Sequence, residues 1–127
     1  MDRILVIDDE PMLLDLLKEY LSDGKYMVDT AEDGILGLKK IQAQEYDLII
    51  TDIKMPGLSG HQILDYVKNG KHCTTPVIGI SGMPWLFKDS PFDAVLTKPF
   101  TSQQLLDVVV ELILKTDFKN KSPLPLI

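Results

Sequence analysis

The most informative stretch of this sequence is YDLIITDIKMPG, residues 46–57. Leu48–Ile50 is a short apolar run rich in β-branched residues, which is typical of a strand buried on both faces of a parallel sheet. Asp52 follows where such a strand would leave the core, and Pro56 with Gly57 then turns the chain. Asp52 alone is equally compatible with a turn residue that caps local backbone. If the strand is central, Asp52 lies at the sheet edge where open α/β folds bind ligands.

Composition narrows the class of protein. The chain has 127 residues, 45% hydrophobic and 25% charged, which suits one globular domain. Its net charge of −6 argues against a nucleic-acid partner, because nucleic acids bind to basic surfaces. No apolar run approaches the ~18 residues that span a membrane, and the N-terminus lacks the pattern of a signal peptide. The single cysteine, Cys73, excludes an intrachain disulfide, so we expect a cytoplasmic protein that binds neither membrane nor nucleic acid.

Strand-like and helix-like segments alternate five times along the chain. The predicted strands cover residues 3–7, 26–28, 48–50, 76–80 and 94–97. The predicted helices begin near residues 11, 34, 59 and 101, and we expect Ile35, Leu38 and Ile41 on the inner face of the second. Thr101 and Gln104 form a predicted capping box for the last helix. This alternation indicates a parallel sheet with helices on both faces, in one domain of residues 1–116, followed by a short tail of residues 117–127.

The residues that follow the strands form the predicted site. Asp8 and Asp9 follow the first strand, Asp52 the third, Ser81 the fourth and Lys98 the fifth. In a parallel sheet these ends share one edge, and neighbouring strands lie about 4.8 Å apart. Two carboxylates about 5 Å apart repel by about 3 kcal/mol at an effective dielectric near 20, so a cation is needed. Oxygen ligands favour Mg²⁺, with Mn²⁺ or Ca²⁺ as alternatives.

Carboxylates, a divalent metal, a lysine and a hydroxyl suit phosphoryl chemistry. A carboxylate can attack phosphorus, while the metal and the lysine neutralise the charge on the phosphoryl oxygens. Simpler interpretations remain for each residue taken alone. Asp8 and Asp9 could cap a helix, Ser81 could be a turn residue, and Lys98 could be a solvated lysine before a proline.

Four motifs resemble those of the receiver domains of two-component response regulators, including the chemotaxis regulators. They are VIDDE at residues 6–10, TDIKMPG at 51–57, Ser81-Gly82, and Lys98-Pro99-Phe100. The resemblance covers residues 3–115. It implies a flavodoxin-like, doubly wound five-stranded parallel sheet with strand order 2-1-3-4-5.

The resemblance also implies roles for individual residues. Asp52 would be the phosphoacceptor, with the phosphohistidine of a histidine kinase or phosphotransfer protein as donor. Mg²⁺ would be held by Asp8, Asp9, Asp52 and the backbone carbonyl of Lys54. Ser81 and Lys98 would bind the phosphoryl group, and the Lys98-Pro99 peptide bond would be cis. Such a protein is a signalling phosphoacceptor that catalyses only its own phosphorylation and dephosphorylation and passes the signal to an unidentified downstream protein.

Two departures from the family pattern concern how the signal leaves the site. Val95 stands where receivers usually carry Tyr or Phe. The segment of residues 82–97 is short and contains Pro84 and Pro91, which predicts a reduced fourth helix. We interpret Trp85 by itself as a packing residue of this loop, while with Leu86 and Phe87 it offers an apolar contact for a partner. We expect a monomer or a weak dimer.

Three other classes of protein compete with this interpretation. A receiver used only as an interaction scaffold would not need the intact acid pair, Asp52, Ser81 and Lys98. A metal-dependent aspartyl phosphatase of the haloacid dehalogenase type requires a second Asp two residues after the nucleophile, where this chain has Lys54. A nucleotide-binding protein requires a Gly-rich phosphate loop, which this sequence lacks. Whether the chain acts alone or as part of a longer protein stays open.

Overall fold

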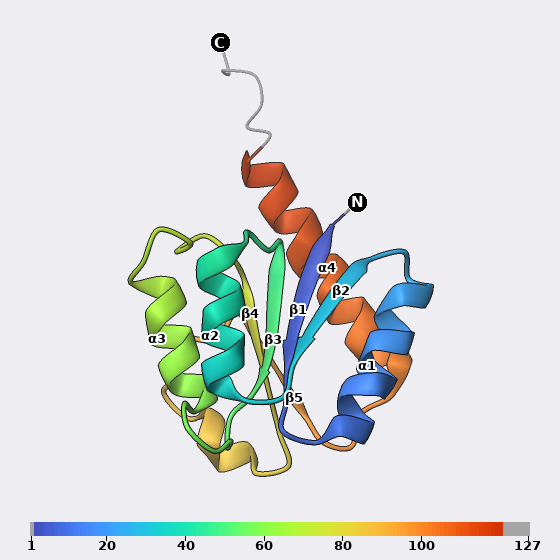
Figure 1. The fold of residues 1–127 in the computed structure, drawn as a ribbon. Helices are drawn as coiled ribbons and strands as arrows, with labels where there is room; N and C mark the ends of the chain where they lie inside the picture. The colour runs from blue at the N-terminus through green and yellow to red at the C-terminus, as the bar shows by residue number, and fades with distance from the viewer. Residues whose placement is uncertain (1, 121–127) are drawn as a thin grey trace.

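The computed structural model describes residues 2–120, which form a five-stranded parallel sheet between two layers of helices (Figure 1). The strands lie in the order β2-β1-β3-β4-β5. Their bounds are β1 (Arg3–Ile7), β2 (Met27–Ala31), β3 (Leu48–Asp52), β4 (Val77–Ser81) and β5 (Ala94–Thr97). The predicted flavodoxin-like sheet and its strand order are therefore confirmed.

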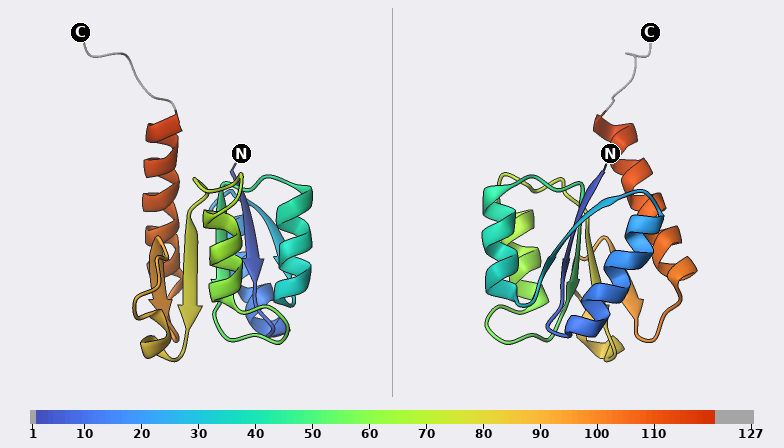
Figure 2. Two further views of the ribbon diagram at one scale, coloured as in Figure 1. Left: turned by 90° about the vertical axis from the view of Figure 1, so that its left-hand side faces the viewer. Right: turned by 45° about the vertical axis from the view of Figure 1, so that its right-hand side comes forward.

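The helices cover the sheet in two pairs. α1 (Pro11–Asp23) and α4 (Ser102–Asn120) lie on one face, and α2 (Gly34–Ala43) and α3 (Gly60–Lys68) lie on the other (Figure 2). Each pair packs apolar side chains against the sheet, so that β3 and β4 are buried along their whole length. Burial on both faces explains the continuous apolar runs of these strands in the sequence.

The observed helix starts agree with the caps predicted from the sequence, with one exception. The predicted capping box is confirmed, because Thr101 Oγ accepts from Gln104 N at 3.0 Å and Gln104 Oε1 accepts from Thr101 N at 2.8 Å. A second box, Ser59 with Gln62, begins α3. The expectation that Asp8 or Asp9 caps α1 was wrong, because the cap position is Glu10 and no side chain caps this helix. The Asp8 carboxylate instead accepts from Glu10 N at 2.9 Å, just before the helix.

The inner face of α2 differs from the prediction. Ile35 is 49% exposed, whereas Gly34, Gly37 and Ile41 are buried. A Cβ at Gly37 would lie 2.5 Å from Ile7 Cδ1 on β1. The helix therefore lies so close to the sheet at Gly37 that a larger residue would have to displace the Ile7 side chain, and Ile35 lies on the side that faces solvent.

Between β4 and β5 the chain forms one short 3₁₀ turn, η1 (Pro84–Phe87), which confirms the predicted reduction of the fourth helix. Where the reduced helix leaves β4 uncovered, the Phe92 ring packs over the strand, since a Cβ on Gly79 of β4 would lie 3.1 Å from this ring. The ring of Phe87 packs edge-on against Phe92, with centroids 6.4 Å apart. The interpretation of Trp85 as a packing residue was wrong, because its side chain is 69% exposed.

The last helix, α4, continues to Asn120, past the predicted domain end at residue 116. Residues 121–127 of the predicted tail lie outside the described residues. Within residues 2–120, no helix combines the length and the apolar character needed to cross a membrane.

Candidate functional site

The residues predicted from the strand ends gather at one edge of the sheet. Strand register places Ile7 opposite Thr51, Asp52 opposite Ile80 and Ser81 opposite Thr97, so the strand ends are level. A cavity of about 320 Å³ opens there. It is lined by Asp9, Glu10, Asp52, Lys54, Ser81, Gly82, Met83 and Lys98. Asp8 is fully buried, and every other predicted site residue lines this cavity.

Backbone contacts fix the position of Asp52. Its Oδ1 atom accepts from Ile53 N at 2.8 Å, and the side chain belongs to the buried end of β3. Gly60 N, at the start of α3, donates to Ile53 O at 2.8 Å. A Cβ on Gly60 would collide with the backbone carbonyl of Asp52, so α3 can press against this strand end only with glycine at that position.

Lys98 lies among three carboxylates. Its Nζ atom is 3.4 Å from Asp8 Oδ2, 3.4 Å from Glu10 Oε1 and 3.5 Å from Asp52 Oδ2. Lys98 N also donates to Ser81 O at 2.9 Å, which ties the segment after β5 to the end of β4. The expected cis bond between Lys98 and Pro99 is present. One cation after β5 thus bridges carboxylates from the ends of β1 and β3.

Burial dominates the electrostatics of the site. It raises the pKa of Asp8 to about 6, with the neighbouring Asp52 charge adding to the effect and the Glu10 N–H and Lys98 opposing it. Burial also raises the pKa of Asp52, against the lowering effects of Lys98 and the Ile53 N–H. Burial lowers the pKa of Lys98, but the carboxylates of Asp8, Asp52 and Glu10 outweigh it, so the net direction is upward. The site therefore holds more negative charge than Lys98 offsets.

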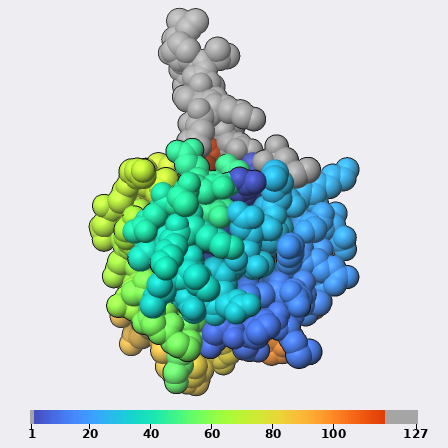
Figure 3. All heavy atoms as spheres, viewed as in Figure 1, coloured from blue at the N-terminus to red at the C-terminus, as the bar shows by residue number. Residues whose placement is uncertain are grey.

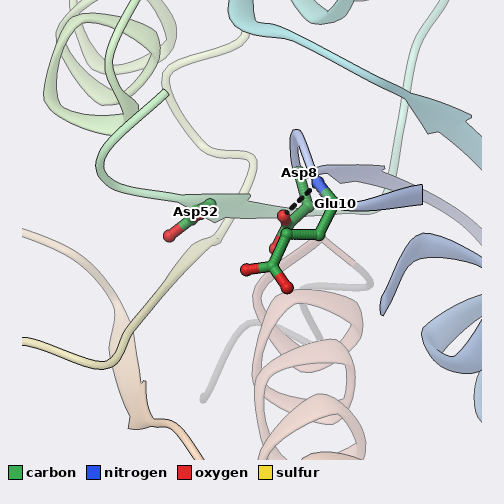
Figure 4. Close-up of side chains that lie close together, drawn as sticks. All are labelled: Asp8, Glu10 and Asp52. Carbon is green, nitrogen blue, oxygen red and sulfur yellow. Dashed lines mark hydrogen bonds between the residues drawn. The ribbon is translucent and has the colours of Figure 1, made fainter. Parts of the chain in front are cut away.

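The acidic residues that come together are Asp8, Glu10 and Asp52, with one oxygen of each within 4.8 Å of the others (Figure 4). Sequence reasoning missed Glu10, which was quoted only within the VIDDE motif and given no role, although it continues the acidic run Asp8-Asp9. Asp9 lies outside this group but lines the same cavity, as does Lys54. Three convergent carboxylate oxygens are a suitable donor set for a hard divalent cation such as Mg²⁺.

Ser81, at the end of β4, lines the same cavity. Its Oγ atom accepts from Met83 N at 3.0 Å, within the turn that follows β4. Because the oxygen acts as acceptor in this bond, its own proton can be donated to another oxygen. The hydroxyl can therefore serve an anionic group in the cavity.

A parallel sheet of this order, with clustered carboxylates, a lysine and a hydroxyl at its carboxyl edge, defines the class of receiver domains. The family model of the response regulator receiver domain matches residues 4–110, and the chain belongs to this family.

Comparison with individual proteins agrees with this assignment. The chain is 36% identical to the response regulator TrrA of Thermotoga maritima, solved in complex with Mg²⁺ and BeF, over 88% of this chain and 99% of that one, with a TM-score of 0.81. A CheY-like receiver from Methanospirillum hungatei has a TM-score of 0.87 at 26% identity, over 94% of this chain and 98% of that one. The transcriptional regulatory protein DltR of Streptococcus agalactiae is 34% identical over 82% of this chain.

The chain spans only part of its curated relatives. It covers 48% of DltR, 32% of the transcriptional activator IrlR of Burkholderia pseudomallei and 13% of the sensor histidine kinase GacS of Pseudomonas protegens. The similarity is therefore to one domain of these larger proteins.

Proposed function

We propose that this receiver accepts a phosphoryl group on Asp52 from the phosphohistidine of a histidine kinase or phosphotransfer protein. The observation that carries this proposal is the geometry of the Asp52 carboxylate. Oδ1 is held by the Ile53 N–H, while Oδ2 lies on the side of Lys98, in a carboxylate that lines the cavity. One oxygen is thus fixed and the other is left for attack.

In the proposed reaction, an Asp52 oxygen forms a bond to phosphorus as the bond between phosphorus and the histidine nitrogen breaks. The nitrogen keeps the electron pair, and the product is an acyl phosphate. Lys98 and the Ser81 hydroxyl stabilise the negative charge on the phosphoryl oxygens. Water attack on the acyl phosphate later releases phosphate and restores the carboxylate, so the domain acts on its own aspartyl phosphate.

Mg²⁺ would be held by Asp8, Asp9, Asp52 and the backbone carbonyl of Lys54, and the position of Glu10 adds a fifth candidate ligand. When bound, the ion supplies positive charge that offsets the carboxylates and the transferring phosphoryl group. The donor set fits this ion, because the charge in the cavity is carried by oxygen ligands and exceeds what Lys98 neutralises.

Labelling with a small phosphodonor tests the acceptor. Acetyl phosphate with Mg²⁺ should add one phosphoryl group to the wild-type protein. Asp52→Asn should lose this addition while remaining folded, because the change is nearly isosteric. The matched control is Asp65→Asn, which alters an exposed acid on α3 and should label normally. Full labelling of Asp52→Asn, read by intact-protein mass spectrometry, would show that another residue is the acceptor.

A further inference from the structure

A second cavity, of about 370 Å³, adjoins the phosphoacceptor site. We call it the Trp85 groove. It is lined by Ile53, Lys54, Met55, Ser59, His61, Met83, Trp85 and Leu86. One wall is the loop after β3 and the other is the segment after β4. Both segments reach the lower edge of the molecule in Figure 3, the first in green and the second in yellow to orange.

The two walls differ in how firmly they are held. Met55 and Ile53 are buried, and the Gly60 N–H bond to Ile53 O fixes the loop after β3. The other wall is one short 3₁₀ turn with no buried residue. Most of the Trp85 side chain is exposed beside the groove. The groove therefore has one firmly held wall, after β3, and one more exposed wall, whose residues 83–86 lie outside the aromatic contact between Phe87 and Phe92.

The more exposed wall is connected to the phosphoacceptor site. Lys54 and Met83 line both cavities. The Ser81 hydroxyl holds the Met83 N–H at 3.0 Å. In the proposed function this hydroxyl donates its proton to a phosphoryl oxygen on Asp52, and any rotation of Ser81 that aligns this bond also moves the oxygen to which Met83 N donates. Phosphorylation thus changes the position of the wall that carries Met83, Trp85 and Leu86.

The charge of the groove indicates what binds there. No carboxylate is among its lining residues, although the whole chain has a net charge of −6. The polar groups at the groove are Lys54, Ser59 and His61, beside the apolar surfaces of Met83, Trp85 and Leu86. Such a site complements a large apolar side chain flanked by negative charge.

We propose that the Trp85 groove is a docking site for a partner protein and that phosphorylation controls the docking. The groove binds a short segment of the partner, in which a large apolar side chain lies next to carboxylates. The gating rests on the proposed function, whereas the groove and its charge do not.

Selection from random displayed peptides tests the chemistry of the occupant. The bait is the wild-type chain with Mg²⁺ and beryllofluoride, and Trp85→Ala is the counter-selection. The selected peptides should carry an aromatic or large aliphatic residue beside Asp or Glu. Replacement of a central aromatic contact should weaken their binding about tenfold or more, and Trp85→Ala should show this loss. Tyr66→Ala, which removes an exposed aromatic side chain on α3, is the matched control and should bind them like the wild type.

Two further measurements separate the steps of the proposal. Versions of a selected peptide with amides in place of carboxylates should lose most of their affinity. Binding should shift the emission of Trp85, the only tryptophan in the chain, and should tighten when Mg²⁺ and beryllofluoride are added. Trp85→Ala should still be labelled on its acceptor by acetyl phosphate.

Several outcomes would overturn the docking site. They are selection of no peptide, selection of basic peptides, equal binding by Trp85→Ala, or a Trp85-dependent dimer in sedimentation, which would place a second copy in the groove. Equal peptide affinity with and without beryllofluoride, in a protein that acetyl phosphate labels on Asp52, would overturn only the gating. Failure of Asp52 labelling with peptide binding retained would instead refute the proposed function.

Discussion

At the scale of single residues, the distinctive feature is the shared lysine. Lys98 is equidistant, to within 0.1 Å, from the carboxylates of Asp8, Glu10 and Asp52. A phosphoryl group on Asp52 must draw Lys98 toward itself and away from at least one of the other two. Glu10 is the most exposed of the three, so water screens its ion pair with Lys98. This ion pair is therefore the weakest of the three and costs the least free energy to break.

The buried Asp8 carboxylate should cost stability when no metal is bound. Its pKa is about 6 in the folded protein and 3.8 ordinarily. At a pH between these two values, the folded state therefore binds a proton that the unfolded state lacks. The free energy of unfolding should therefore fall as the pH rises from about 4 to about 6, and the cost is complete above that. Asp8→Asn should raise the metal-free free energy of unfolding near neutral pH by about 1–2 kcal/mol.

Urea denaturation with a chelator and with Mg²⁺ measures this effect. Wild type should gain stability on adding Mg²⁺, because a ligand that binds only the native state stabilises it. Asp8→Asn should gain much less. The control, Asp9→Asn, alters the exposed neighbour and should leave the metal-free stability unchanged. A less stable metal-free Asp8→Asn would contradict the expectation, since it would show that the ion pair with Lys98 outweighs burial.

At the scale of elements, the loss of one helix is compensated by an aromatic cluster. Phe92 fits over Gly79, meets Phe87 edge-on and lies 5.6 Å from the His61 ring, measured between centroids. His61 is also tied to Ser90, with Nε2 and Oγ 2.7 Å apart. These contacts join the segment between η1 and β5 to α3. These side-chain contacts thus hold the short turn in place, whereas a longer helix would be held by packing its apolar face against the sheet.

Phe92→Ala should therefore destabilise the domain. Replacement of a fully buried phenylalanine by alanine lowers the free energy of unfolding by about 3–5 kcal/mol. Phe92 is half-buried, so we expect a loss of about 2 kcal/mol. The midpoint of urea unfolding measures this. Val95→Ala, on the outer face of β5 with 44% of its side chain exposed, is the control and should change stability by about 0.5 kcal/mol or less. Equal effects of the two variants would show that the aromatic cluster does not hold this segment.

At the scale of the whole molecule, the surface around β5 has unusual features for self-association. The exposed Val95 is short and stiff at χ1, and the neighbouring turn is one 3₁₀ turn instead of a helix. α4 nevertheless carries exposed apolar side chains, Val110 and Leu114, one helical turn apart. Two such side chains give a contact much smaller than a stable dimer interface.

We expect the chain to remain mainly monomeric, with or without Mg²⁺ and beryllofluoride. Analytical ultracentrifugation over a range of protein concentrations measures this. A dimer that forms only with beryllofluoride would contradict the expectation. Its loss in Leu114→Lys, but not in the α1 variant Leu16→Lys, would then locate the interface on α4.

The sequence by itself determined the parallel sheet and the residues at its edge, whereas the strand order was implied by the resemblance to receiver domains. Apolar strands end in Asp8, Asp52, Ser81 and Lys98, and the parallel topology brings such ends together whatever the side-chain packing. Pro84 and Pro91 likewise predicted the short η1, because proline restricts the local backbone directly. Local chemistry was sufficient for these features.

Only the tertiary structure decided which acids converge and which faces are buried. Glu10 joins Asp8 and Asp52 because the Asp8 carboxylate accepts from Glu10 N in the turn before α1, and because Lys98, some 90 residues away, lies close to both Asp8 and Glu10. Ile35 faces solvent because Gly37 lies against Ile7 of the sheet and Gly34 against the backbone of Leu58, close approaches that periodicity alone does not reveal. Trp85 is exposed because Phe92, and not Trp85, fills the space over Gly79. In each case distant residues compete for one place, and the competition is resolved only when the chain is folded.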